Sequence, residues 1–137
     1  MDTYLDDVLE SLEKLDYDIL AHLMNPLKYI EKTAGITVEL SRFDDKIGKI
    51  LQYIIQHGIA LEVNTAVLYT DYHQLMPGEK ILQNYRDMGG YLITLGSDAH
   101  IAQRAANGFN EAVSVLKAMG FRNLFYYEGR KSRYYNL

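Results

Sequence analysis

The residues best placed to do chemistry in this chain are Asp98 and His100, two positions apart in the segment YLITLGSDAH (91–100). The apolar run at 92–95 predicts a buried strand, and the Gly-Ser pair after it lets the backbone turn as it leaves the sheet. In an extended segment, residues i and i+2 point to the same side, so both side chains can meet beyond the strand. A carboxylate beside an imidazole suits a divalent metal such as zinc or manganese. The alternative is an aspartate that caps the next helix beside a bystander histidine, because two ligands fall short of a full metal site.

Other polar residues are expected at the ends of neighbouring strands. His22 and Asn64 each close an apolar segment of strand type, and Arg130 lies just beyond a third such segment. In α/β barrels and open α/β sheets, active sites form where the carboxyl ends of the strands meet. We therefore expect these residues to converge with Asp98 and His100. Taken alone, His22 is more simply explained by a backbone partner, and a solvated terminus explains Arg130 equally well.

The elements that must position these residues alternate along the chain. Apolar segments predict strands at 18–22, 59–64, 91–95 and 123–127. Helical periodicity and end signals predict helices over 3–15, from Ser41 to His57, from Pro77 to the glycines at 89–90, and over 103–119. Residues 23–40 are expected to be a long connection, which is often functional in a compact domain. Such alternation is typical of a mostly parallel sheet with right-handed crossovers, so we predict an α/β fold: a partial (βα) barrel of about four βα units.

Composition limits the classes of function. The chain has 137 residues, enough for one domain with a real core, and a net charge of −4. Because no basic block stands out, a nucleic-acid partner is not expected. The absence of cysteine excludes disulfides and thiolate metal sites. No apolar run approaches a membrane span, and the acidic N-terminus is unlike a signal peptide, so a soluble, cytoplasmic protein without a membrane partner is predicted.

Several short motifs resemble one known family. These motifs are GSDAH (96–100), DILAH (18–22), LEVNT (61–65), NGF (107–109) with LKAMGF (116–121), and GRK (129–131). Together they resemble the carboxyl half of the PHP (polymerase and histidinol phosphatase) family and are most similar to its histidinol-phosphatase branch. The resemblance covers nearly the whole chain, so residues 1–137 are expected to form a single domain that corresponds to this half.

The resemblance implies a phosphoesterase on a distorted (βα)7 barrel that holds up to three divalent metals (zinc, manganese or iron). His22, Asp98 and His100 match metal ligands of the family. Arg104 falls where an arginine of the phosphatase branch grips the substrate phosphate, and Asn64 would line the site. From its position, Arg130 is also expected to contact the substrate.

The sequence departs from the family pattern in two ways. The family begins with an HxH motif, followed by further His and Glu ligands, and this chain contains none of them. Tyr69 also stands where family members often carry an arginine suited to phosphate.

The expected function is therefore a metal-dependent phosphomonoesterase, a histidinol-phosphatase acting on L-histidinol phosphate, of which this chain is the carboxyl part. The isolated chain is expected to be inactive or weak. A half barrel exposes sheet edges, so a homo-oligomer or a missing amino half is expected to cover them. The alternative is a non-catalytic PHP half that binds a metal or a partner.

Overall fold

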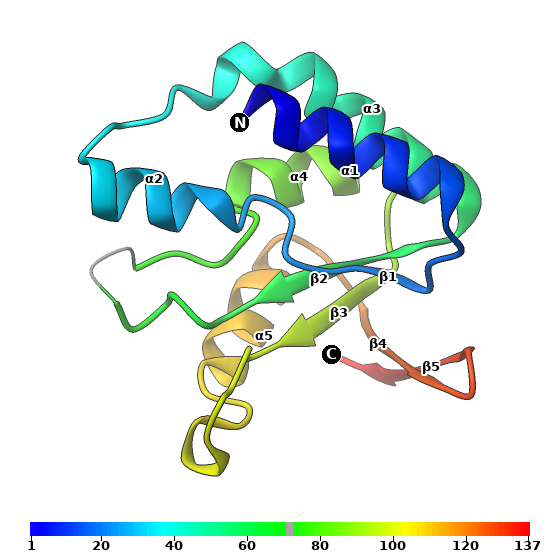
Figure 1. Cartoon of the computed structure of the whole chain (residues 1–137). Helices are drawn as coiled ribbons and strands as arrows, with labels where there is room; N and C mark the ends of the chain where they lie inside the picture. The colour runs from blue at the N-terminus through cyan, green and yellow to red at the C-terminus, as the bar shows by residue number, and fades with distance from the viewer. Residues whose placement is uncertain (71–72) are drawn as a thin grey trace.

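A three-stranded parallel sheet lies at the centre of the computed structural model, which describes residues 1–70 and 73–137, except for the side chains of residues 32 and 33. Its strands are β1 (Ile19–Leu20), β2 (Ala60–Asn64) and β3 (Ile93–Gly96), and β2 lies in the middle (Figure 1). Leu20 pairs with Leu61 in one ladder, and Asn64 pairs with Gly96 in the other. The predicted α/β fold with a parallel sheet is confirmed for these three strands.

Helices α1, α3 and α4 are drawn above these strands in Figure 1, and α5 below them. The predicted helices are confirmed as α1 (Asp2–Lys14), α3 (Asp44–His57), α4 (Glu79–Asp87) and α5 (Phe109–Ala118), but α5 begins at Phe109 rather than at residue 103. Two 3-10 turns complete the helical part, η1 (Leu40–Phe43) and η2 (Ala102–Arg104). Among the described residues, no helix is both long and apolar enough to span a membrane.

The segment 23–40 differs from the predicted connection, because it contains helix α2 (Pro26–Ala34). Pro26 occupies the start of this helix, where its fixed φ and missing N–H cost nothing. Gly35 ends the helix in the left-handed conformation, at φ 63°. Both signals were in the sequence, but the proline and the glycine were interpreted as breaks in a connection rather than as the two ends of a helix.

The fourth predicted strand does not join the parallel sheet. Strand β4 (Asn123–Glu128) pairs antiparallel with β5 (Lys131–Asn136) in a separate hairpin, so the basic, aromatic segment expected as a tail is a strand. Gly129 and Arg130 form the two-residue turn at φ 53° and 64°, as in a type I′ hairpin. The prediction of four parallel βα units is therefore wrong for the last unit, and the partial barrel stays a prediction.

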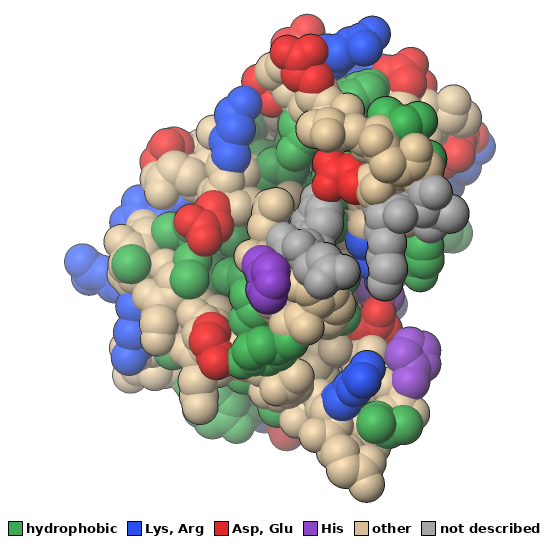
Figure 2. All heavy atoms as spheres, turned by 90° about the vertical axis from the view of Figure 1, so that its left-hand side faces the viewer, with side chains coloured by type: hydrophobic (Ala, Val, Ile, Leu, Met, Phe, Trp, Pro, Cys, Tyr) green, Lys and Arg blue, Asp and Glu red, His purple; other side chains and the backbone are tan. Residues whose placement is uncertain are grey.

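One surface of the molecule faces the direction in which the parallel strands point. Figure 2 shows this surface, on which acidic, basic and histidine side chains all reach solvent. The carboxyl ends of β1, β2 and β3 lie on this side in Figure 1. We call it the carboxyl edge of the sheet, and the opposite end the amino edge.

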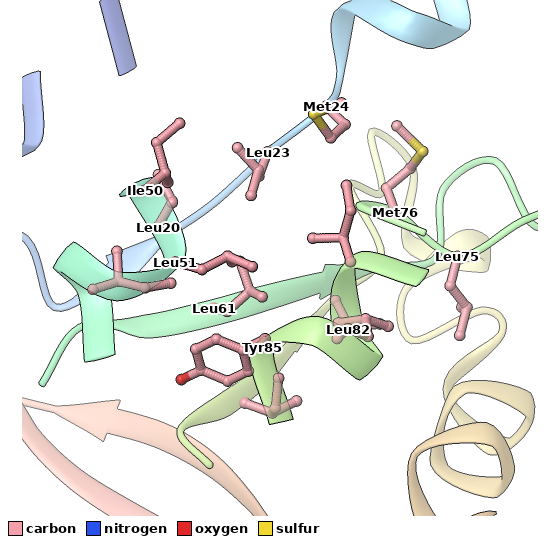
Figure 3. Packing of buried hydrophobic residues seen from close by; sticks show 14 of the residues in the cluster. Leu20, Leu23, Met24, Ile50, Leu51, Leu61, Leu75, Met76, Leu82 and Tyr85 are labelled. Carbon is pink, nitrogen blue, oxygen red and sulfur yellow. The ribbon is translucent and has the colours of Figure 1, made fainter. Parts of the chain in front are cut away.

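The core lies between the sheet and the helices above it. Leu61 and Val63 of β2 are fully buried, and so are Ile50, Leu51 and Ile54 of α3 (Figure 3). Burying a side chain of this size contributes about 1.5–3 kcal/mol. Because β2 is covered in this way, its position and register are fixed, and with them the place where each strand of the sheet ends.

Candidate functional site

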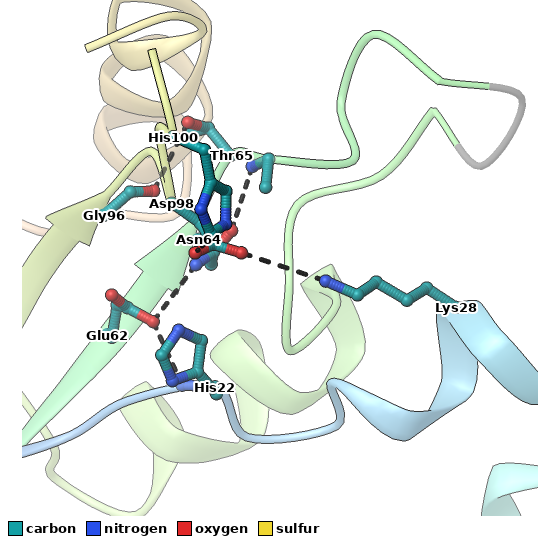
Figure 4. A network of polar contacts seen from close by, with 9 residues as sticks. His22, Lys28, Glu62, Asn64, Thr65, Gly96, Asp98 and His100 are labelled. Carbon is teal, nitrogen blue, oxygen red and sulfur yellow. Dashed lines mark hydrogen bonds and ion pairs between the residues drawn. The ribbon is translucent and has the colours of Figure 1, made fainter. Parts of the chain in front are cut away.

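The carboxyl edge brings together residues that lie far apart in the sequence. His22 follows β1, Asn64 ends β2, and Asp98 and His100 follow β3. Figure 4 shows their side chains gathered around Glu62. The His100 Nε2 lies 3.6 Å from the Asp98 Oδ1. The structure therefore places His22, Asp98 and His100 at the same edge of the sheet, and Asp98 and His100 as a neighbouring pair.

The backbone that produces this convergence is not extended, as the sequence reasoning assumed. Asp98 lies in the left-handed region at φ 47°, and His22 does so at φ 62°. A residue with a side chain in this region costs about 1–3 kcal/mol, and such residues cluster at functional sites. The Asp98 and His100 side chains therefore meet because the chain turns between them. The hydroxyl of Ser97 helps to hold this turn, since it accepts the Ala106 N–H at 3.2 Å.

Glu62 belongs to the site although it was not predicted there. Its Oε2 accepts the backbone N–H of His22 at 3.0 Å and the side-chain amide of Asn64 at 3.3 Å. A Cβ at position 96 would overlap the Glu62 Oε1. Only glycine therefore fits at this position while Glu62 lies so close to the backbone. The sequence carried a signal, because Glu62 and Asn64 alternate onto the same face of β2 and a carboxylate in a strand needs a partner.

Lys28 is the second residue that sequence reasoning missed. Its Nζ lies 3.9 Å from the Asp98 Oδ2, and only 19% of its side chain is exposed. Figure 4 shows it reaching from α2 toward Asp98. A lysine within a segment expected to be a connection has no predictable direction. Once Pro26 is recognised as a helix start, Lys28 falls in the first turn.

A pocket of about 430 Å³ opens beside these residues. Its lining includes Lys28, Thr65, Asp98, His100 and Arg104. Arg104 ends the short turn η2 and is exposed, so its guanidinium can reach a ligand in the pocket. Two cations and an aspartate–histidine pair thus face one space of a size suited to a small molecule.

Asn64 and Arg130 are placed differently from the other predicted residues. Asn64 is buried, and its Oδ1 accepts the Ala66 N–H at 2.9 Å, so both ends of its amide support neighbouring segments. Arg130 was expected on the carboxyl side, and this placement is wrong. Its guanidinium lies 2.8 Å from the Asp16 carboxylate and 3.1 Å from that of Asp18, ahead of β1 at the amino edge.

The donor atoms of the site fit part of a divalent metal site. A carboxylate oxygen and an imidazole nitrogen are suitable ligands, and Asp98 and His100 present them side by side. Within the described residues, no group of three or more histidine, aspartate and glutamate side chains is arranged to hold a metal ion. The residues present therefore fit a metal as two neighbouring ligands that need others.

Comparison with curated proteins gives three matches to histidinol-phosphatases. A probable histidinol-phosphatase of Thermotoga maritima is 34% identical over 121 residues, which are 88% of this chain and 49% of the relative. The histidinol-phosphatase of Lactococcus lactis is 30% identical over 91% of this chain and 45% of the relative. A probable histidinol-phosphatase of Clostridium acetobutylicum is 28% identical over 96% of the chain and 51% of the relative. The chain is related to the histidinol-phosphatases.

A solved structure supports the same relation. Histidinol phosphate phosphatase from Lactococcus lactis, in complex with zinc, L-histidinol and phosphate, matches 96% of this chain with a TM-score of 0.78 and 26% identity. The match covers 50% of that structure, and the chain spans about half the length of the curated relatives. No protein-family model matches the sequence. The resemblance carried by the GSDAH, DILAH and LEVNT motifs is thus confirmed as a relation to these phosphatases.

Proposed function

We propose that the chain supplies part of the active site of a metal-dependent phosphomonoesterase that hydrolyses L-histidinol phosphate. The observation that carries this proposal is the Asp98–His100 pair, which lies beside Lys28 and Arg104 in one pocket of a chain related to histidinol-phosphatases. The related structure holds zinc, L-histidinol and phosphate. A histidinol phosphate is therefore the small phosphorylated substrate that we assign to this pocket.

Each residue has a role that follows from its chemistry. Asp98 and His100 would hold the metal, and His22 would reach it from the end of β1. A bound divalent metal supplies an acidified water and offsets negative charge on the phosphoryl oxygens. Arg104 and Lys28 would bind the phosphate through charge-assisted hydrogen bonds.

Tyr69 replaces a cation that could bind the phosphate, so another cation has to make this contact. It stands where an arginine is common in the family, and its hydroxyl donates to the Glu111 carboxylate. This contact raises the pKa of Tyr69 and lowers that of Glu111, so the phenol stays neutral and holds the loop to α5. Lys28 is the partly buried cation that can take over the phosphate contact.

The remaining metal ligands would come from polypeptide outside the described residues. Two neighbouring ligands do not complete a divalent metal site, and a catalytic zinc site commonly uses three protein ligands. They could lie in another part of a longer chain or in a second copy. Residues 1–137 would then be the carboxyl half of a PHP-type barrel, active in the cytoplasm after this completion.

The test compares the chain with Asp98→Ala and a matched control, Asp87→Ala, whose carboxylate accepts a bond from Gln83 on the exposed side of α4. We expect the chain and the control to bind L-histidinol phosphate in calorimetry, and to bind Zn²⁺ or Mn²⁺ weakly because only part of the ligand set is present; Asp98→Ala should lose the metal. Light scattering tests the second copy, because a monodisperse monomer at high concentration would rule out the homo-oligomer. A chain that binds neither metal nor L-histidinol phosphate would overturn the proposal.

The shortage of ligands favours one further candidate, a non-catalytic metal- or partner-binding module. Phosphate release from L-histidinol phosphate separates the two candidates. Metal-dependent release that Asp98→Ala abolishes supports the enzyme. Metal binding without release, even by the complete assembly, supports the module.

A further inference from the structure

Glu62 contacts residues at the ends of all three parallel strands. It lies in β2, the middle strand of the sheet. Its side chain reaches His22, which follows β1, and Gly96, which is the last residue of β3. Toward β1, its Oε2 accepts the His22 N–H at 3.0 Å. Toward β3, its Oε1 occupies the space above Gly96 that a Cβ would fill. Within β2, the same carboxylate accepts the Asn64 amide at 3.3 Å.

These contacts determine where the proposed ligands point. His22 is held in the left-handed region, and the hydrogen bond from its N–H to Glu62 fixes the peptide plane that sets this conformation. Gly96 stands two residues before Asp98, so the side chain that packs on it fixes the start of the turn to Asp98. Figure 4 shows His22 below and Asp98 above the level of the Glu62 carboxylate, with Asn64 beside it.

The charge of Glu62 also distinguishes it from Asp98. Asp98 has the Lys28 ammonium 3.9 Å away, whereas the contacts found for Glu62 in the described part of the chain come from neutral donors. Removing a carboxylate from water is costly unless hydrogen bonds or an opposite charge compensate. Both hydrogen bonds reach the Glu62 Oε2, whereas its Oε1 packs against Gly96.

We propose that Glu62 is the positioning residue of the candidate site: its carboxylate holds the His22 backbone and packs on Gly96, and so sets where the His22 segment and the Asp98–His100 pair lie relative to each other. The inference rests on the proposed function, because it assumes that the Asp98–His100 pair takes part in holding a metal. Residues that orient metal ligands typically change metal affinity about 10–100-fold when they are replaced.

The experiment uses three variants of the full chain and one control. Glu62→Ala removes both the acceptor and the charge, and Glu62→Gln keeps an acceptor oxygen without the charge. Gly96→Ala leaves Glu62 intact but forces it away, since the new Cβ would overlap its Oε1. Gly48→Ala is the control, because Gly48 lies in α3 with no atom within 4 Å of an added Cβ.

Two measurements are made by NMR on each protein. The first is the hydrogen exchange rate of the His22 amide in the metal-free chain. The second is a Mn²⁺ titration that follows the broadening of the His22 and His100 signals. We expect faster His22 exchange and about 10–100-fold weaker Mn²⁺ binding in Glu62→Ala and Gly96→Ala. Glu62→Gln is expected to keep the His22 protection and lose part of the Mn²⁺ affinity, and Gly48→Ala to match the parent.

The outcomes separate this inference from the function on which it rests. If the parent chain binds no Mn²⁺, the proposed metal site fails, while the His22 exchange rates still report whether Glu62 positions this segment. If folded Glu62→Gln and Gly96→Ala both keep the parent's exchange rate and Mn²⁺ affinity, the positioning role is wrong. These two variants decide the question should Glu62→Ala fail to fold.

Discussion

Charged side chains lie at both ends of the parallel sheet, but they have different partners at the two ends. At the carboxyl edge, Asp98 has a lysine 3.9 Å away and a histidine at 3.6 Å, beside an open pocket. At the amino edge, Arg130 is held by two aspartates, one of them at 2.8 Å. The aspartate hydrogen bonds raise the pKa of Arg130, with Asp18 as the main cause. The Arg130 guanidinium is thus paired with protein carboxylates, whereas the charges at the carboxyl edge remain available to a ligand.

This contrast shows what residue type alone cannot decide. An arginine just beyond an apolar strand is a candidate for contact with the substrate, as Arg130 was in the sequence. The direction of the strand that precedes it determines which edge it reaches. Strand β4 belongs to a hairpin rather than to the sheet, and its Phe125 packs against Tyr91 ahead of β3, so the hairpin turn lies at the amino edge. Changes at the two edges should therefore affect different measurements.

The largest expected effect is on stability, from Tyr85→Ala at the amino edge. Tyr85 is fully buried, and its hydroxyl donates to the Leu92 carbonyl at 3.2 Å just before β3. Its removal leaves a large cavity, which should lower the free energy of unfolding by about 3–5 kcal/mol in urea titrations. Below the denaturation midpoint, the folded variant should still bind Mn²⁺. Loss of Mn²⁺ binding in a variant that remains folded would show that the two edges are coupled.

A smaller effect is expected at the carboxyl edge, from Lys28→Met. This change keeps most of the side-chain volume and removes the charge beside Asp98. A charge-assisted hydrogen bond contributes about 1.5–3 kcal/mol, so phosphate binding should weaken about tenfold or more. Calorimetry with inorganic phosphate on the metal-loaded chain measures this, with Lys14→Met on the exposed face of α1 as the control. Equal phosphate affinities for the two variants would show that Lys28 does not bind the phosphate.

The pH dependence of stability should come from the amino edge at high pH. Burial raises the pKa of Tyr85 to about 12, from its ordinary value near 10. Above pH 10 the unfolded chain releases this proton while the folded chain retains it, so the free energy of unfolding falls between about pH 10 and 12. Tyr85→Phe should flatten this fall relative to the parent in urea titrations across that range. An identical slope in both proteins would contradict the assignment to Tyr85.

The smallest effect is expected from Arg130→Ala. Exposed ion pairs contribute little and are screened by salt, so the thermal midpoint should fall slightly, and the difference should shrink at about 0.5 M NaCl. Binding of Mn²⁺ and phosphate should not change, because the guanidinium lies at the other edge. Weaker phosphate binding by this variant would show that Arg130 contacts the substrate, as the sequence predicted.

Much of the fold could be predicted because local signals and periodicity agreed. Helix α3 carries a clear apolar stripe, and Gly58 ends it in the left-handed conformation. Strands β2 and β3 are apolar runs bounded by turn residues. Helix α2 was missed because Pro26 and Gly35 were interpreted as breaks within a long connection, although they start and end this helix. The hairpin was missed because Gly129-Arg130 is a less familiar I′ turn than Asn-Gly.

The candidate site was predictable only as far as its ligands follow strand ends. His22, Asp98 and His100 could be placed from the parallel alternation of strands and helices, and Arg104 from the family resemblance. Lys28 could not be placed, since its direction depends on how α2 packs. The contact between Glu62 and His22 spans 40 residues, and nothing local in the sequence specifies it.

The order of the strands has a consequence for how the site forms in time. His22 and Asp98 follow the outer strands of the sheet, and β2, which carries Glu62, separates them. Neither outer strand can be aligned with the other until the middle strand is in place, and contacts over such long stretches of chain form slowly. The site should therefore be absent from any species that precedes docking of the third strand. Mn²⁺ added during refolding would then report the last step of assembly rather than the first.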